Sequence, residues 1–384
     1  MSQKASPPTR SARVWSTLTP YLAACLVALL AACAQTPSAS PPPDETAPPS
    51  TEQPEEPQDT SLDRLRPRII FDTDLGYDAD DAGALAVLHA LADNGEADIL
   101  ATITVVGDPY SAGALSVINT YYGRPELPVG AYMGERWLDA YPYWFEDGSD
   151  FLKPLVEEYP SPIRTRDEAH EAVSLYRKTL AAQPDNSVTV VTVGFLQNLA
   201  DLLASGPDEH SPLSGADLVA QKVKELVVMG GEHPEDSENI EFNFRGGPEN
   251  DGRATQTVVR DWPTRIVFSG AEIGNAVLTG SGLADTLPDN PVARAYELYP
   301  GTNALGERQS WDLTAVLYAV RGAGELWTVL EDEHIEVFED GSHRWHPGAA
   351  DPVRAFLAFQ TDPDDVKSVL DELLVQPPRA AAAP

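Results

Sequence analysis

This 384-residue chain has only two cysteines and few basic residues for its acidic ones. The two cysteines, Cys25 and Cys33, lie within the first 33 residues, so residues 34–384 contain no thiol. This excludes disulfide bonds, thiolate catalysis and cysteine metal sites from the rest of the chain. Lys and Arg number 26 against 60 Asp and Glu, which gives a formal net charge of -34. Such a charge repels phosphate backbones, so nucleic acid is not expected among the partners.

The N-terminal segment lacks a hydrophobic run long enough to cross a bilayer. Its apolar stretch, Tyr21 to Leu30, follows three basic residues and leads into Ala31-Ala32-Cys33. The segment resembles the signal of a bacterial lipoprotein. A transmembrane anchor is the alternative, but it needs roughly 20 apolar residues. We predict a signal peptide at residues 1–32, a lipid on Cys33 as the only membrane contact, and a place in the cell envelope facing the periplasm or the exterior.

Two regions of different composition follow the signal. Residues 33–66 are rich in Pro, Ser, Thr, Glu and Asp and predict an extended tether. From residue 67 to residue 384, short Val- and Ile-rich runs alternate with helix-like segments, which predicts one α/β domain with an open, mostly parallel central sheet and helices on both faces. The expected strands are Arg68–Asp72, Ile99–Val106, Val188–Val193, Glu225–Met229 and Arg265–Ser269, and the expected helices are Asp80–Ala92, Ala112–Tyr122, Leu196–Ala204, Gly252–Asp261 and Asp312–Val320.

Carboxylates crowd the turn after the first expected strand. Ligands of open parallel sheets collect at the carboxyl ends of the strands, so this turn is a natural site. Five aspartates fall within ten residues there, and they repel one another unless a cation neutralises them: Asp72, Asp74, Asp78, Asp80 and Asp81. Hard oxygen donors suit Ca²⁺ or Mg²⁺. Helix capping by acidic residues is the alternative, but it accounts for only one or two of the five.

Five segments in a fixed order carry a resemblance to a known family. They are Asp72-Thr73-Asp74 with Asp80-Asp81, then Val191 to Asn198, Val228 to Gly231, Glu241-Phe242-Asn243, and Trp311-Asp312. Together they resemble the nucleoside hydrolases, calcium-dependent N-ribohydrolases built on an α/β sheet, over roughly Arg68 to Val320. The resemblance implies that the chain hydrolyses the N-glycosidic bond of a nucleoside. It also implies a homo-oligomer, as many members form.

The same resemblance implies roles for individual residues. Ca²⁺ would be held by Asp74, Asp81, the carbonyl of Val193 and Asp312, with Asp74 also the general base. The sugar would be bound by Asp80, Met229, Glu241 and Asn243. Simpler interpretations exist for three of these residues: Met229 as a core side chain, Glu241 as part of an exposed loop, and Asp312 as a helix cap.

Three further residues are candidates for contacting or protonating the base that leaves the sugar. Trp311 precedes the expected calcium aspartate, as in purine-specific members, and an indole can stack on a purine. Asp108 follows the second strand, and His233 follows the Met-Gly-Gly segment as a candidate acid. A solvated loop histidine is the alternative for His233. The aromatic stretch Tyr141 to Phe145 is interpreted as a packing insertion rather than a lid.

Two other classes of function are weighed against a purine nucleoside hydrolase. A surface-tethered nucleoside- or sugar-binding protein would keep the site without catalysis. A phosphohydrolase of the haloacid dehalogenase type would use Asp72 and Asp74 as nucleophile and acid, but the sequence offers no convincing lysine for its phosphate.

Overall fold

The computed structural model describes residues 66–138, 151–234, 240–287, 289–348 and 353–379. Contacts divide the chain into residues 1–60 and 61–384, and the described residues all belong to the second unit. The predicted signal peptide, Cys33, nearly all of the predicted tether and the stretch Tyr141 to Phe145 lie outside the described residues. No helix in the described ranges has the length and apolarity needed to span a membrane.

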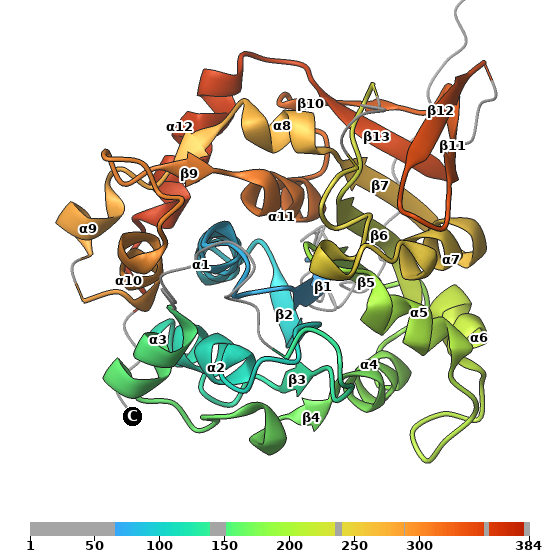
Figure 1. Ribbon diagram of the computed structural model, residues 1–384, viewed down its shortest axis with the longest axis horizontal. Coiled ribbons are helices and arrows are strands. Elements are labelled where there is room, and N and C mark those ends of the chain that lie inside the picture. Colours follow the sequence, from blue (N-terminus) through green and yellow to red (C-terminus); the bar gives the residue numbers. More distant parts are fainter. Residues whose placement is uncertain (1–65, 139–150, 235–239, 288, 349–352, 380–384) are drawn as a thin grey trace, which may run out of the picture. The chain divides into compact units, whose positions relative to one another are not determined.

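Within the described residues, one nine-stranded sheet forms the centre of the domain (Figure 1). In order across the sheet, the strands are β10 (Trp327–Leu330), β13 (Arg354–Phe359), β7 (Arg265–Ser269), β6 (Val223–Met229), β5 (Val188–Thr192), β1 (Arg68–Thr73), β2 (Asp98–Thr104), β3 (Val129–Ala131) and β4 (His170–Glu171). Neighbouring strands run parallel except β10 and β13. The predicted open, mostly parallel sheet is confirmed.

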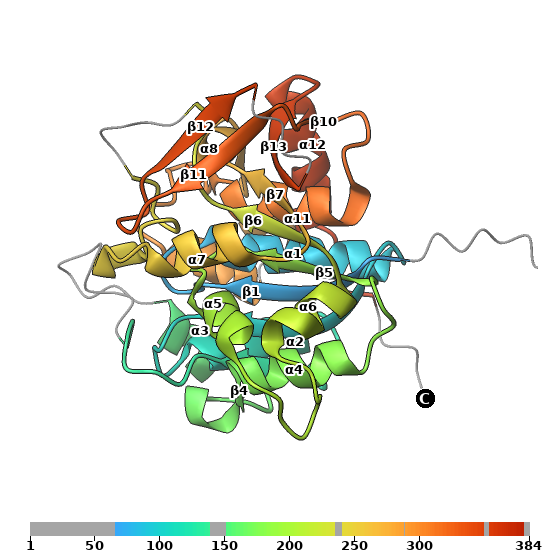
Figure 2. The same ribbon diagram turned by 90° about the vertical axis from the view of Figure 1, so that its right-hand side faces the viewer.

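Helices cover both faces of this sheet, which is why its strands are apolar almost throughout. In β1, Ile69 and Phe71 enter one core and Ile70 enters the other, as the alternation of a strand requires. The helices of the first core are α1 (Asp80–Asp93), α2 (Ser111–Tyr121), α3 (Leu152–Glu158), α10 (Pro291–Leu298), α11 (Trp311–Arg321) and α12 (Pro363–Leu374). Those of the second core, in front of the sheet in Figure 2, are α4 (Ala172–Ala181), α5 (Gln197–Ala204), α6 (Gly215–Lys222) and α7 (Arg253–Asp261).

Shorter elements complete the domain. A hairpin packs its inward side chains, among them Ile335 and Trp345, on the second core. The short elements are β11 (Glu333–Val337) and β12 (His343–Pro347) of this hairpin, β8 (Leu278–Thr279), β9 (Arg308–Gln309), α8 (Ala271–Asn275), α9 (Leu283–Thr286), η1 (Arg166–Glu168) and η2 (Gly247–Glu249). All ten elements expected from the sequence are present, with ends shifted by no more than two residues.

A buried histidine makes the stability of the domain depend on pH. His89 of α1 is fully buried, and its Nε2 lies 2.9 Å from Oδ1 of Asn119. Arg124 lies 3.1 Å from the other ring nitrogen, Nδ1, and pairs with Asp93 at 2.6 Å. Burial, assisted by the charge of Arg124, lowers the pKa of His89 to about 3. The imidazole is therefore neutral in the folded protein at neutral pH.

We expect His89 to destabilise the fold as the pH falls from about 6.5 towards 3, because in that interval the unfolded chain binds a proton that the folded one does not. The loss approaches about 1.4 kcal/mol per pH unit for this one group. Urea unfolding at several pH values should give a shallower acid-side slope for His89→Gln than for the wild type. His346→Gln, on the exposed face of the hairpin, is the matched control. Equal slopes for wild type and His89→Gln would contradict the prediction.

Candidate active site

One pocket of about 250 Å³ opens where the carboxyl ends of the central strands meet. Its lining brings together ten residues singled out in the sequence: Asp74, Asp78, Asp80, Asp81, Val193, Met229, Glu241, Asn243, Trp311 and Asp312. They come from the ends of β1, β5 and β6, from the loops before α1 and after β6, and from the first turns of α1 and α11. Residues almost 240 positions apart in the chain thus share one cavity.

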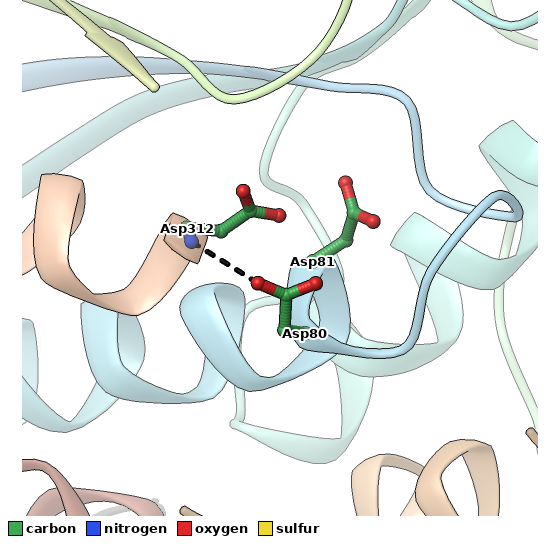
Figure 3. A group of neighbouring side chains, drawn as sticks. All are labelled: Asp80, Asp81 and Asp312. Atoms are coloured by element: carbon green, nitrogen blue, oxygen red, sulfur yellow. Dashed lines mark hydrogen bonds between the residues drawn. The ribbon is translucent and has the colours of Figure 1, made fainter. Parts of the chain in front are cut away.

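Three aspartates at the start of two helices form the acidic part of the pocket. Asp80 and Asp81 open α1, and Asp312 lies in the first turn of α11. Each offers one carboxylate oxygen, and these oxygens lie within 4.8 Å of one another. Figure 3 shows the three side chains converging, with the backbone N–H of Asp312 donating to Oδ2 of Asp80 at 3.1 Å. The amide dipoles of both helices favour negative charge here.

The chemistry of this cluster fits a hard divalent cation. Burial raises the pKa of Asp80, Asp81 and Asp312 well above its usual range, and the negative charges of the neighbouring aspartates raise it further. Thr73 donates to Oδ1 of Asp81, whereas Oδ2 is buried without a hydrogen-bond partner. Such an oxygen is costly to bury unless a positive charge meets it. An oxygen-only donor set is what Ca²⁺ or Mg²⁺ requires.

Asp74 lies directly after β1 and packs closely against the turn that follows β5. Its side chain is 5% exposed, and burial and the charge of Asp80 raise its pKa. Gly194 makes this closeness possible, because a Cβ atom at that position would lie 2.5 Å from the backbone nitrogen of Asp74. The carboxylate therefore reaches the pocket beside the cluster, where a proton acceptor for water would be needed.

Asp72 does not join the other carboxylates. It lies in β1, accepts from the hydroxyl of Tyr176 at 2.7 Å and from the amide of Asn198 at 3.1 and 3.2 Å, and is absent from the pocket lining. Burial raises its pKa to about 7. The five-carboxylate cluster expected from the sequence is therefore corrected: Asp72 ties β1 to α4 and α5, and the remaining four line the pocket.

Glu241 and Asn243 line the cavity as well, and hydrogen bonds to the backbone hold both side chains in place. Glu241 accepts backbone N–H groups of Gly231 and Phe244 at 3.0 Å and of Asn243 at 2.9 Å. The side-chain amide of Asn243 donates to the carbonyls of Val193 at 2.9 Å and Met229 at 3.2 Å. These bonds use the nitrogen of the amide and leave its oxygen to accept from a ligand hydroxyl.

The opposite rim is aromatic and carries a positive charge. The indole N–H of Trp311 donates to Oδ1 of Asn275 at 3.1 Å, which holds the ring in place. The guanidinium of Arg308 lies 4.7 Å from the centroid of that ring and is paired with Asp78. A planar, electron-poor ligand could thus meet both an aromatic face and hydrogen-bond donors.

Comparisons with known proteins agree with this arrangement. The family model described as inosine-uridine preferring nucleoside hydrolase matches residues 69–367. The chain belongs to this family. It is 31% identical over 169 residues to an uncharacterized protein of Schizosaccharomyces pombe, covering 43% of this chain and 48% of that protein.

Two further comparisons place this nucleoside hydrolase family member among its relatives. It is 26% identical over 191 residues to the inosine-uridine preferring nucleoside hydrolase of Crithidia fasciculata, covering 47% of this chain and 54% of that protein. The chain thus spans about half the length of the curated relatives it matches. Its fold is similar to the purine-preferring ribonucleoside hydrolase from Gardnerella vaginalis, with a TM-score of 0.60, 17% identity, and coverage of 80% of this chain and 98% of that one.

Two candidates lie outside the pocket of this family member. Oδ1 of Asp108 accepts the backbone N–H of Tyr110 at 2.8 Å, just before α2. The ring of His233 stacks on Phe356 at 3.6 Å between centroids, and its Nε2 lies 3.3 Å from a carboxylate oxygen of Glu333. Neither residue lines the pocket. Among the described residues, Asp108 and His233 thus lie outside the cavity that holds the other candidates, and His233 packs on β13 rather than standing in solvent.

Sequence reasoning missed five residues that line this nucleoside hydrolase pocket: Tyr77, Phe242, Ala271, Asn275 and Arg308. Phe242 lies between Glu241 and Asn243 in a recognised motif, which predicts roles only for those two polar neighbours. Arg308 stands three positions before Trp311, and nothing in its local pattern indicates a partner 230 positions away.

Proposed function

We propose that this protein hydrolyses the N-glycosidic bond of ribonucleosides, with a preference for purines, and releases ribose and the free base. The observation that carries the proposal is the single pocket that joins buried aspartates, the polar wall of Glu241 and Asn243, and the indole of Trp311. The names of the Crithidia and Gardnerella proteins, for inosine-uridine and purine nucleosides, support the same chemistry.

Calcium is the proposed cofactor, and four groups of the chain would hold it: Asp74, Asp81, Asp312 and the carbonyl of Val193. Bound Ca²⁺ would acidify a water and orient the ribose hydroxyls. Asp74 would accept a proton from the attacking water as the water oxygen forms its bond to C1′ of the sugar. Asp80, Glu241 and Asn243 bind the ribose hydroxyls, and Met229 lines the sugar pocket. These hydrogen bonds strengthen as the ring flattens towards an oxocarbenium ion, so they accelerate the reaction.

Release of reducing sugar from inosine, guanosine, adenosine and uridine tests this function directly. We expect release from the purine nucleosides with Ca²⁺ and its loss on adding a chelator. Release from uridine at an equal rate would remove the purine preference and leave the hydrolase. A chain that binds nucleosides tightly but cleaves none of the four would instead be a tethered binding protein, the second function that this pocket could serve.

We expect Ca²⁺ to stabilise the fold, because it relieves repulsion among its ligands Asp74, Asp81 and Asp312 and their neighbour Asp80 that only the folded chain imposes. Free Ca²⁺ at about 100 times its Kd adds about 2.7 kcal/mol of stability. Differential scanning calorimetry should show Tm rising with Ca²⁺ and falling when a chelator is added. A Tm unaffected by either would argue against a cation in this cluster.

We also propose that a lipid on Cys33 anchors the protein in the cell envelope. Its ligand would be a nucleoside, and its assembly state a homo-oligomer. Membrane fractionation tests the anchor: Cys33→Ser should release the protein from the membrane fraction, whereas Cys25→Ser should leave it there. Equal fractionation of both variants would contradict the anchor. Light scattering of the solubilised chain would test the oligomer.

A further inference from the structure

Arg308 is the one basic residue in the described lining of the pocket. It belongs to β9, which pairs with β8 outside the main sheet, immediately before α11. Its side chain is 17% exposed. Burial lowers the pKa of Arg308, but hydrogen bonds to Asp78 and the charge of that carboxylate outweigh burial and raise it. A permanent positive charge therefore lies in the lining of a cavity to which six of the fifteen lining residues contribute carboxylates.

The guanidinium is oriented by neighbours that use three of its five N–H groups. Asp78 accepts from Nε at 2.9 and 3.1 Å and also from Nη2. Gln309 accepts from Nη1 at 2.9 Å. One N–H on each of Nη1 and Nη2 has no further hydrogen-bond partner in the described part of the chain. Two N–H donors are thus left on the guanidinium, whose central carbon lies 4.7 Å from the centroid of the Trp311 ring.

We propose that Arg308 is the residue that selects the base, and that its two remaining N–H groups bind O6 and N7 of a 6-oxopurine nucleoside. This inference rests on the proposed hydrolase function. A guanidinium fork matches the adjacent acceptors O6 and N7 of guanine, and hypoxanthine presents the same pair. Adenine carries an amino donor in place of O6, which would face the donors of Arg308. The substrates expected from this geometry are inosine and guanosine.

The same contact favours bond cleavage as well as binding. When the bond between C1′ and N9 breaks, its electron pair stays on the base, and in a 6-oxopurine the negative charge spreads onto O6 and N7. A fixed positive charge at those atoms stabilises the transition state more than the ground state. A guanidinium does not give up a proton in proteins, so the departing base takes its proton from solvent water while Asp74 keeps the proton of the attacking water.

Asp78 acts through Arg308 as a positioning residue. Its carboxylate binds the guanidinium, and its Oδ1 also accepts the backbone N–H of Ala79 at 2.6 Å, which ties the pair to the start of α1. The loop carrying Asp78 therefore sets where the two donors of Arg308 point. Asp78→Asn keeps the size of the side chain and removes the charge that holds the guanidinium.

Steady-state kinetics of the full-length chain with Ca²⁺ test the proposal on inosine, guanosine and adenosine. For Arg308→Met we expect kcat/KM to fall about 10- to 100-fold on inosine and guanosine, mainly through kcat, and less than about threefold on adenosine. Arg308→Lys should recover only part of the rate, because one ammonium cannot span both acceptors. Asp78→Asn should give a smaller loss with the same substrate pattern. The matched control is Arg321→Met, at the far end of α11 and paired with Glu96, which should retain wild-type selectivity.

An equal loss on all three nucleosides would overturn the inference, and so would adenosine as the best wild-type substrate. An unchanged Tm increase with Ca²⁺ would show that the variants keep the fold and the cation cluster. If the wild type cleaves no nucleoside, the hydrolase proposal fails separately, and calorimetric binding then decides the role of Arg308. Equal inosine affinity of the wild type and Arg308→Met would overturn it, whereas weaker binding of inosine alone would support it.

Discussion

Asp74→Asn is expected to lower kcat by about 10²- to 10⁴-fold, the range that a positioned general base contributes. The amide has nearly the size of the carboxylate but cannot accept the proton of the attacking water. The fold should tolerate the change, because Asp74 is buried beside Asp80 and their like charges oppose each other. Initial rates of inosine cleavage at saturating Ca²⁺ measure the effect.

Asp98→Asn is the matched control for this substitution. Asp98 begins β2, its side chain is half exposed, and its partner is Arg66 on the surface. Its replacement should leave kcat unchanged. A rate for Asp74→Asn above a tenth of wild type, with Ca²⁺ bound normally, would show that another group accepts the proton.

Asp81→Asn is expected to weaken Ca²⁺ binding by about two orders of magnitude or more and to abolish turnover at micromolar Ca²⁺, since ligand charge sets calcium affinity. Asp81 presents a buried oxygen with no hydrogen-bond partner, and Thr73 orients the other oxygen. Isothermal titration calorimetry measures the Kd, and the Asp98→Asn variant again serves as control.

The stability of Asp81→Asn separates a cation ligand from a structural residue. In the presence of a chelator the variant should unfold at a Tm no lower than that of the wild type, because one of several repelling charges has been removed. With Ca²⁺ the wild type should gain stability and the variant should not. A variant that is less stable than wild type in chelator would mean that Asp81 serves the fold itself.

Local patterns in the sequence were sufficient to predict the central strands of the fold and the helices that follow them. β1, β5 and β7 are short apolar runs buried on both faces, and α1 and α11 are apolar segments that begin with aspartates. Residues in runs of this kind are buried when helices cover both faces of a parallel sheet. The outer strands were missed because β3 and β4 contain three and two residues, too few to show a period. β10 and β13 follow the last recognised motif and carry no polar residue that indicates a site.

Local sequence patterns also explain why ten residues of the pocket lining could be named from the sequence. Asp74, Val193 and Met229 stand at or just after the ends of parallel strands, and parallel strands bring those ends to one edge. The order of motifs therefore fixed which residues share the cavity, although no single motif did so. The carboxylates are buried because they lie at this edge of the sheet, and buried carboxylates favour binding of a cation.

Side-chain direction and partners at long range depended on the tertiary structure. Asp72 and Asp74 are two positions apart, yet the first faces Tyr176 and Asn198 and the second faces the pocket, because β1 ends between them. Asp108 and His233 follow strand ends as the true pocket residues do, but Asp108 accepts the N–H of Tyr110 beside α2 and His233 packs against β13.

The pair of Asp78 and Arg308 is the clearest case of this dependence. Each residue has an ordinary local sequence, and 230 positions separate them. Only the folding of β9 against the loop before α1 joins their charges and leaves two donors beside Trp311. Sequence spacing specifies which residues lie at the active edge of a parallel sheet because the backbone geometry is regular. The contacts between residues on that edge depend on loop paths, which have no such regularity.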